Sequence, residues 1–190
     1  MCIRDRIGDI EKRLITISEY HKMAEVGILT EKDKVELLNG EIIQLSPINS
    51  KHGGHVKRIN KLLGKLLDDL AIMGVQDPIV IPDFSEPEPD ISVLKPEEDD
   101  YTTKHPTSKD VYFLIEVSDS TLYLDRTVKL PIYAEAKIKE YWIVNLVDNS
   151  IEVYKNPQKD NYDNKSTYHI GDEIELTDFN LKIKVSDVLR

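Results

Sequence analysis

Apolar residues recur at helical spacing in two long stretches of this 190-residue chain. In residues 55–73 they repeat every three or four positions, which predicts one amphipathic helix that ends near Gly74. Residues 124–136 predict a second helix, bent at Pro131 because proline removes one backbone donor. Both helices have an apolar stripe that must pack against another element.

The N-terminal part of the chain has clear start and turn signals. A short strand or turn in residues 14–26 leads into a third helix, which Thr16 or Ser18 could cap. Two short apolar runs then flank Asn39 and Gly40. This dipeptide favours positive φ at both turn positions, so the pattern predicts a β-hairpin.

The remaining apolar runs are short and bounded by prolines or turn residues, as strands are. Since these strands interleave with the helices, the chain predicts an α/β or α+β fold. The expected architecture is a mixed β-sheet flanked by helices, with an N-terminal hairpin and C-terminal hairpin additions. The expected strands cover residues 75–82, 90–94, 111–117, 140–146 and 151–154, a segment near Tyr168, and residues 181–185.

The length suits a single domain, expected over residues 13–190 after a leader at residues 1–12, which has no periodicity and is either disordered or artefactual. No apolar run approaches the length of a membrane span, so no membrane partner is expected. Cys2 is the lone cysteine, which excludes an intrachain disulfide and favours a reducing, cytoplasmic setting.

Charge is distributed unevenly along the chain. The formal net charge of −10 argues mildly against nucleic acid as a partner, because phosphate contacts need lysine and arginine. Yet residues 51–67 contain no acid, whereas residues 83–100 hold eight acids and one lysine. Within the basic window, Lys57, Lys61 and Lys65 share one helical face. That face could follow a DNA backbone, or it could simply be solvated.

Two carboxylates stand at the ends of expected strands. Asp90 follows Pro89 and opens one strand, and Glu116 lies at the far end of the buried strand at residues 111–117. If the two strands are neighbours, these carboxylates meet at one edge of the sheet, where they repel each other and resist ionising. A hard divalent cation such as Mg²⁺ would remove that conflict, because it takes oxygen ligands.

A cation can reach the same edge from the second helix. Asp125, Lys129 and Tyr133 are four residues apart and share a face, and a short loop returns this helix toward Glu116. The Lys129 ammonium could then stabilise charge on a phosphoryl oxygen. The alternative is structural: Glu116 and Lys129 form an ion pair, Asp125 is a surface partner of Lys129, and Asp90 is a turn residue.

Other polar residues have weaker signals. His52 and His55 have a spacing that can bind metal, but no third ligand is near them in sequence, and helix-start histidines are usually caps or phosphate contacts. Glu36 and Glu41 flank the hairpin turn, and one of them could face the site formed by Asp90 and Glu116. Glutamates in hairpins are more commonly solvated. Trp142 is expected in the core.

Taken in order along the chain, these motifs resemble the putative restriction endonuclease family, a Uma-type branch of the PD-(D/E)XK nuclease superfamily. The segments "ELLNGEIIQLSP" and "HGGHVKRINKLL" are similar to the N-terminal half of that family, so the likeness extends over about residues 14–190. The motifs that carry it are Pro89-Asp90, Glu116-Val117-Ser118, Ser120-Thr121, Asp125, Lys129, Tyr133 and Glu140-Tyr141-Trp142.

The resemblance implies a restriction-endonuclease-like fold in which Asp90 and Glu116 bind Mg²⁺ or Mn²⁺. In the wider superfamily the catalytic lysine follows the second acid by two residues, where this chain has Ser118. The resemblance therefore implies that Lys129, on the following helix, takes that role. Residues that could support the site are His52, Ser118, Asp125, Tyr133 and Glu41.

The expected function is metal-dependent hydrolysis of DNA phosphodiester bonds by an endonuclease. The alternative is a catalytically inactive module that has the nuclease fold and binds a partner. The acidic composition and Ser118 at the usual lysine position favour this alternative. The hairpin at residues 140–154 could offer an edge for a homodimer.

Overall fold

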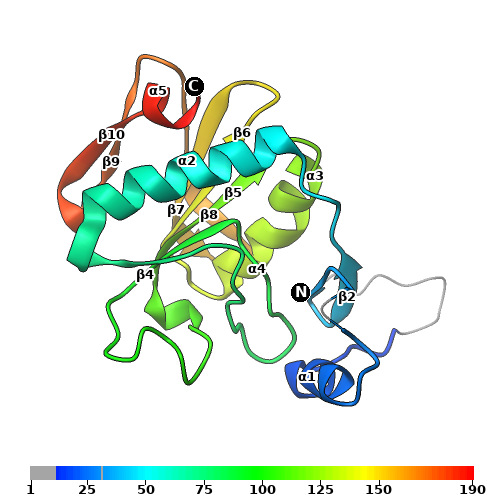
Figure 1. Cartoon of the computed structure of the whole chain (residues 1–190). Helices are drawn as coiled ribbons and strands as arrows, with labels where there is room; N and C mark the ends of the chain where they lie inside the picture. The colour runs from blue at the N-terminus through cyan, green and yellow to red at the C-terminus, as the bar shows by residue number, and fades with distance from the viewer. Residues whose placement is uncertain (1–11, 31) are drawn as a thin grey trace.

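The computed structural model describes residues 12–30 and 32–190, and its centre is a six-stranded sheet (Figure 1). The strands lie in the order β3-β4-β5-β6-β7-β8; β5 and β6 pair in parallel, and the other neighbours pair antiparallel. This arrangement confirms the mixed sheet that the sequence predicts. The bounds are β3 (Ile72–Gly74), β4 (Ile91–Leu94), β5 (Val111–Ser118), β6 (Glu140–Asn145), β7 (Ser150–Gln158) and β8 (Asn161–Tyr168).

Helices cover both faces of this sheet. Helix α2 (Ser50–Leu67) packs on one face, and a helical segment made of α3 (Leu122–Leu124), the π-helical turn η3 (Asp125–Lys129) and α4 (Leu130–Glu135) packs on the other (Figure 1). The other elements are α1 (Ile17–Glu25), the hairpin of β1 (Val35–Leu38) and β2 (Glu41–Gln44), η1 (Asp68–Leu70), η2 (Ser108–Asp110), the hairpin of β9 (Glu173–Leu176) and β10 (Leu181–Lys184) with η4 (Thr177–Phe179) between them, and α5 (Val185–Val188).

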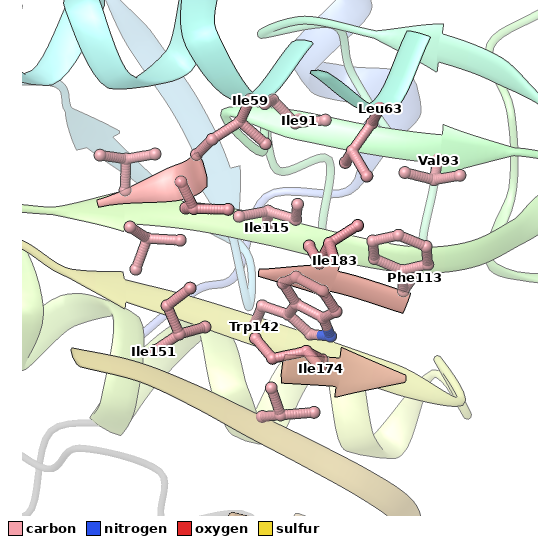
Figure 2. Close-up of a cluster of buried hydrophobic side chains, with 14 of the residues drawn as sticks. Ile59, Leu63, Ile91, Val93, Phe113, Ile115, Trp142, Ile151, Ile174 and Ile183 are labelled. Carbon is pink, nitrogen blue, oxygen red and sulfur yellow. The ribbon is translucent and has the colours of Figure 1, made fainter. Parts of the chain in front are cut away.

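The face under α2 is a dry core. Strand β5 sends alternate side chains to opposite faces, and Phe113 and Ile115 join the apolar cluster on this side (Figure 2). Val117 belongs to the same cluster. Trp142 from β6 is 1% exposed and stacks on Phe113 with ring centroids 5.2 Å apart, as expected for a core residue. The C-terminal hairpin closes the cluster with side chains such as Ile174.

The face under α4 combines apolar and polar side chains. Leu114 of β5 packs in a second cluster with Tyr133 of α4 and Tyr141 of β6, whose rings meet edge to face at 4.9 Å. Farther along β5, Glu116 and Ser118 are also buried. Polar groups therefore enter the interior at the C-terminal end of β5.

Two N-terminal predictions are confirmed. Thr16 caps α1: its hydroxyl accepts the Glu19 N–H, and the Glu19 carboxylate accepts the Thr16 N–H. The hairpin turn has φ of 49° at Asn39 and 77° at Gly40, the left-handed region that this dipeptide tolerates. A Cβ at Gly40 would lie 2.6 Å from the Leu14 Cβ, so glycine is also needed for space.

The long helix differs from its predicted bounds. It begins five residues earlier than residue 55, because Asn49 accepts the His52 N–H and caps it, and it ends at Leu67. Residues 72 and 73, expected in the helix, form β3 together with Gly74 instead. Gly74 therefore does not end the helix but lies in a strand, where a Cβ would come within 2.2 Å of the Ser92 hydroxyl.

The predicted strand at residues 75–82 is wrong. Only isolated bridges form there, from Val80 to Thr107 and from Ile81 to Ser85. Pro78 and Pro82 lack the N–H groups that a continuous ladder requires, which explains why the apolar residues between them are buried without a strand.

The second helix is not simply bent at Pro131. It contains the wider π-helical turn η3, in which the Leu130 N–H donates to the Asp125 carbonyl, and Pro131 occupies the first turn of α4. In the C-terminal tail, the strands near Tyr168 and after Asn180 form as expected. Strand β9 and helix α5 were not predicted.

Of the expected leader, residues 1–11 lie outside the described residues, and Lys12 forms an ion pair with Glu41. In the described parts of the chain, no helix combines the length and the apolar character that a membrane crossing requires.

Candidate active site

Asp90 and Glu116 lie side by side, because β4 and β5 are antiparallel neighbours with Ile91 opposite Ile115. Both carboxylates are buried, with 7% and 3% of the residue exposed. The Asp90 N–H lies 3.4 Å from Glu116 Oε2, and the Val117 N–H donates to Asp90 Oδ2 at 2.9 Å. The condition set by the sequence, that these strands be neighbours, is met.

Lys129 reaches this pair from η3. Its Nζ lies 3.0 Å from Glu116 Oε1, and the Tyr133 hydroxyl donates to the same oxygen at 2.9 Å. Lys129 is itself 4% exposed. The structure therefore brings Asp90, Glu116, Lys129 and Tyr133 together in one buried cluster.

The fifth member of the cluster is Glu36 of β1. It is fully buried, its Oε2 lies 3.2 Å from Lys129 Nζ and accepts the Glu88 N–H at 3.0 Å, and its Oε1 has no hydrogen-bond partner. Of the two hairpin glutamates, the sequence assigned a supporting role to Glu41. The structure instead places Glu41 in a half-exposed pair with Lys12. Glu36 stands between apolar residues of a strand, as Glu116 does. This pattern could have indicated from the sequence that Glu36 is buried.

Ser118 and Asp125 form a polar arm beside the cluster. The Ser118 hydroxyl donates to Asp125 Oδ2 at 2.6 Å, and the Thr121 hydroxyl donates to the same oxygen at 2.8 Å. Asp125 is 2% exposed, so it is not a surface partner of Lys129. Ser118 thus orients Asp125.

His52 contacts the cluster from the N-terminus of α2. Its Nε2 lies 2.9 Å from Asp90 Oδ2, while its Nδ1 is buried without a partner. Gln76 donates to the other oxygen, Asp90 Oδ1, at 3.1 Å. His55 does not converge with His52, because its ring bonds to the Lys51 carbonyl. The two histidines therefore do not form a shared site.

Negative charge exceeds positive charge in this cluster. Burial raises the pKa of Glu116 well above its usual value; Lys129 opposes this shift, and Asp125, Asp90 and Glu36 add to it. Burial also raises the pKa of Asp125. For Lys129, burial would lower the pKa, but the carboxylates of Glu116 and Glu36 outweigh it and raise the pKa. The ammonium stays charged, and the surrounding carboxylates require a further proton or cation.

The donor set suits a hard cation. In the part of the chain that the structure describes, no three His, Cys, Asp or Glu side chains group closely enough for an all-protein metal cage. Mg²⁺ does not need one, since it keeps several waters and commonly binds through one or two carboxylates. Asp90 and Glu116 fit that requirement, and Glu36, which shares Lys129 with Glu116, keeps one buried oxygen, Oε1, without a hydrogen-bond partner.

The lysine stripe lies on the solvent side of α2. Lys57, Lys61 and Lys65 are all exposed, and α2 also carries His52 at its N-terminal end. The stripe therefore lies on the same helix as His52, which contacts Asp90.

Comparison with solved structures identifies the fold. A putative nuclease belonging to DUF820 from Anabaena variabilis ATCC 29413 superimposes with a TM-score of 0.74 over 92% of this chain and 97% of that chain, at 16% sequence identity. The chain therefore has the fold of that nuclease. The Uma2 family, described as "Putative restriction endonuclease", matches residues 17–186. This chain belongs to the Uma2 family. No curated protein matches it.

Proposed function

We propose that this protein is a metal-dependent endonuclease that hydrolyses phosphodiester bonds in DNA. One observation carries the proposal: Asp90 and Glu116, adjacent at the end of two strands, share a buried cluster with the Lys129 ammonium. Membership of a family of putative restriction endonucleases supports a nuclease reaction. The proposal adds the metal and the DNA substrate.

Asp90 and Glu116 would hold Mg²⁺ or Mn²⁺, with Glu36 beside them. When bound, such a cation lowers the pKa of a water and polarises a phosphoryl oxygen. The chain supplies the rest. His52 and Gln76 orient Asp90, and Tyr133 orients Glu116.

Lys129 would stabilise the negative charge that builds up on the non-bridging phosphate oxygens during attack. A buried ammonium is effective in this role, because electrostatic interactions are stronger away from water. The lysine stripe on α2 would contact the DNA backbone and contribute to binding without sequence readout.

A second candidate, a nuclease-fold module that binds without cutting, is favoured by two observations. The net charge is −10, and Ser118 stands where the wider superfamily has its lysine. Binding of duplex DNA without cleavage under any divalent cation would select this alternative.

The deciding experiment measures cleavage of supercoiled plasmid and linear duplex with Mg²⁺, with Mn²⁺ and with EDTA. Glu116→Gln and Lys129→Met should each lower the rate by about 10²–10³-fold, the cost of losing one preorganised charge at a transition state. Full activity of both variants would refute the assignment.

Matched variants sharpen the experiment. Glu36→Gln should impair cleavage, whereas Glu41→Gln, in the same hairpin but outside the cluster, should not. Replacing the three stripe lysines with glutamine should raise KM and leave kcat unchanged, because these contacts are made equally in the ground and transition states.

A further inference from the structure

A second buried glutamate lies in the same cross-strand row as Glu116. The register pairs Glu116 with Ile143 of β6, and Ile143 with Glu152 of β7. Adjacent strands are about 4.8 Å apart, so the two glutamates stand about 10 Å apart on one face of the sheet. Glu152 is 3% exposed.

The π-helical turn η3 contacts both glutamates. Lys129 binds Glu116 at 3.0 Å, and Arg126, three residues earlier, forms a two-point ion pair with Glu152. Arg126 Nε donates to Glu152 Oε2 at 3.2 Å, and Nη2 donates to Oε1. A planar guanidinium matches a carboxylate in this forked geometry, which a lysine cannot reproduce.

Glu152 is held in place independently of η3. The Tyr154 hydroxyl donates to its Oε2 at 2.5 Å, and Lys165 Nζ lies 3.0 Å from the same oxygen. These partners come from β7 and β8, whose residues do not enter the Asp90–Glu116–Lys129 cluster. Glu152 is therefore a fixed point on the sheet to which Arg126 attaches the turn.

The turn needs such an attachment. Its Leu130 N–H donates five residues back to Asp125, the hydrogen bond of a π-helix, which is rare, occurs mostly as a single turn within an α-helix and is frequent at functional sites. Relaxation of this turn to α-helical spacing would rotate Lys129, which contacts Glu116, relative to Asp125, which accepts from Ser118 and Thr121.

We propose that Arg126, anchored by Glu152, is a positioning residue that holds η3 in its wide form and so places the Lys129 ammonium against Glu116. Arg126 acts through Lys129 and does not itself touch the reacting phosphate. The proposal rests on the proposed nuclease function for its kinetic test and on the fold alone for its structural test.

The kinetic test compares Arg126→Met and Arg126→Lys with the wild-type protein at saturating DNA and Mg²⁺. A misplacement of about 1 Å can cost about 10²-fold in rate, so kcat should fall by about that factor in Arg126→Met and partly in Arg126→Lys. KM should change little. Wild-type kcat in Arg126→Met would overturn the proposal.

Two comparisons separate positioning from stability and from direct DNA contact. Lys165→Met removes another cation from Glu152 but leaves the link to η3, so its kcat should stay at the wild-type value even if its melting temperature falls. In a Lys129→Met background, Arg126→Met should cause no further loss of activity, because both changes remove the same function. Additive losses would show that Arg126 acts on its own and would overturn the proposal.

Hydrogen exchange gives a readout that needs neither DNA nor metal. The Leu130 amide should exchange faster in Arg126→Met than in the wild-type protein or in Lys165→Met, at equal exchange in β5. Unchanged Leu130 protection would overturn the proposal even if the wild-type protein cuts no DNA. If the wild-type protein cuts no DNA and Arg126→Met still loses Leu130 protection, Arg126 holds η3 as proposed and only the nuclease function is contradicted.

Discussion

The two faces of the central sheet differ in what they bury. Under α2, strands β4 to β7 contribute an apolar cluster in which Trp142 stacks on Phe113 (Figure 2). Under η3 and α4, the same strands contribute Glu116, Ser118 and Glu152, all at most 3% exposed. One strand, β5, supplies both faces by simple alternation.

The difference indicates how stability and function are divided. Burial of apolar surface stabilises a fold without further requirements, whereas each buried charge must find a partner. Glu152 has enough partners in Arg126, Lys165 and Tyr154. Glu116 shares one ammonium with Glu36 and has Asp90 and Asp125 nearby, so this end of the sheet is left in need of positive charge.

The largest change in stability should come from a substitution in the apolar cluster under α2. Trp142→Ala should lower the free energy of unfolding by about 3–5 kcal/mol, because it leaves a cavity where a fully buried indole stood. Urea denaturation measures this loss. Activity per folded molecule, assayed well below the melting temperature, should stay near the wild-type value. A fall in kcat would show that the apolar face also affects the candidate active site.

A smaller change in the free energy of unfolding should come from binding of a divalent cation at Asp90 and Glu116. Mg²⁺ or Mn²⁺ at about 100 times its dissociation constant should stabilise the protein by about 2.7 kcal/mol, since binding favours the native state. Differential scanning fluorimetry would follow this as a rise in melting temperature. Asp90→Asn should abolish the rise. An equal rise in that variant would place the binding ion elsewhere.

The smallest expected effect is a difference in how Glu116 and Glu152 make the stability of the protein depend on pH. Burial raises the pKa of Glu116 above 4.5, so its contribution to stability is present at low pH and is lost as the pH rises above 4.5. For Glu152, burial would raise the pKa, but the hydrogen bond from Arg126 and its other partners outweigh it and lower the pKa. Its contribution is therefore present above pH 4.5 and lost as the pH falls below that value.

Denaturation curves of Glu116→Gln and Glu152→Gln across this range would check the opposite slopes. Relative to the wild-type protein, Glu116→Gln should gain stability as the pH rises. Glu152→Gln should approach the wild-type stability as the pH falls. Parallel curves for both variants would contradict the contrast between the two sites.

Much of the fold follows from local sequence. The Thr16 capping box, the Asn39-Gly40 turn and the apolar alternation of β5 each arise from interactions within a few residues, and each was predictable. The predictions that failed concern segments whose structure depends on contacts with distant parts of the chain. Residues 72 and 73 look helical by period but pair with β4, and residues 75–82 look like a strand but are interrupted by prolines.

The candidate site was predictable as a set of residue types and only partly as a geometry. The residue pattern left Asp90, Glu116 and Lys129 open to a structural interpretation as well, and the resemblance to the nuclease family singled them out. Glu36 was missed, because a hairpin glutamate is usually solvated and only the docking of β1 against residues 84–88 buries this one. The π-helical turn had no sequence signal beyond Pro131.

The buried cluster joins segments that are distant along the chain. Glu36 comes from a hairpin outside the main sheet, Asp90 and Glu116 come from two strands of it, and Lys129 comes from a later helix. During synthesis on a ribosome, the acids emerge first, and β5 has no parallel neighbour until β6 follows. A nascent chain that ends before residue 129 thus carries the three carboxylates without the ammonium that pairs with them, so the cluster is complete only after η3 has emerged.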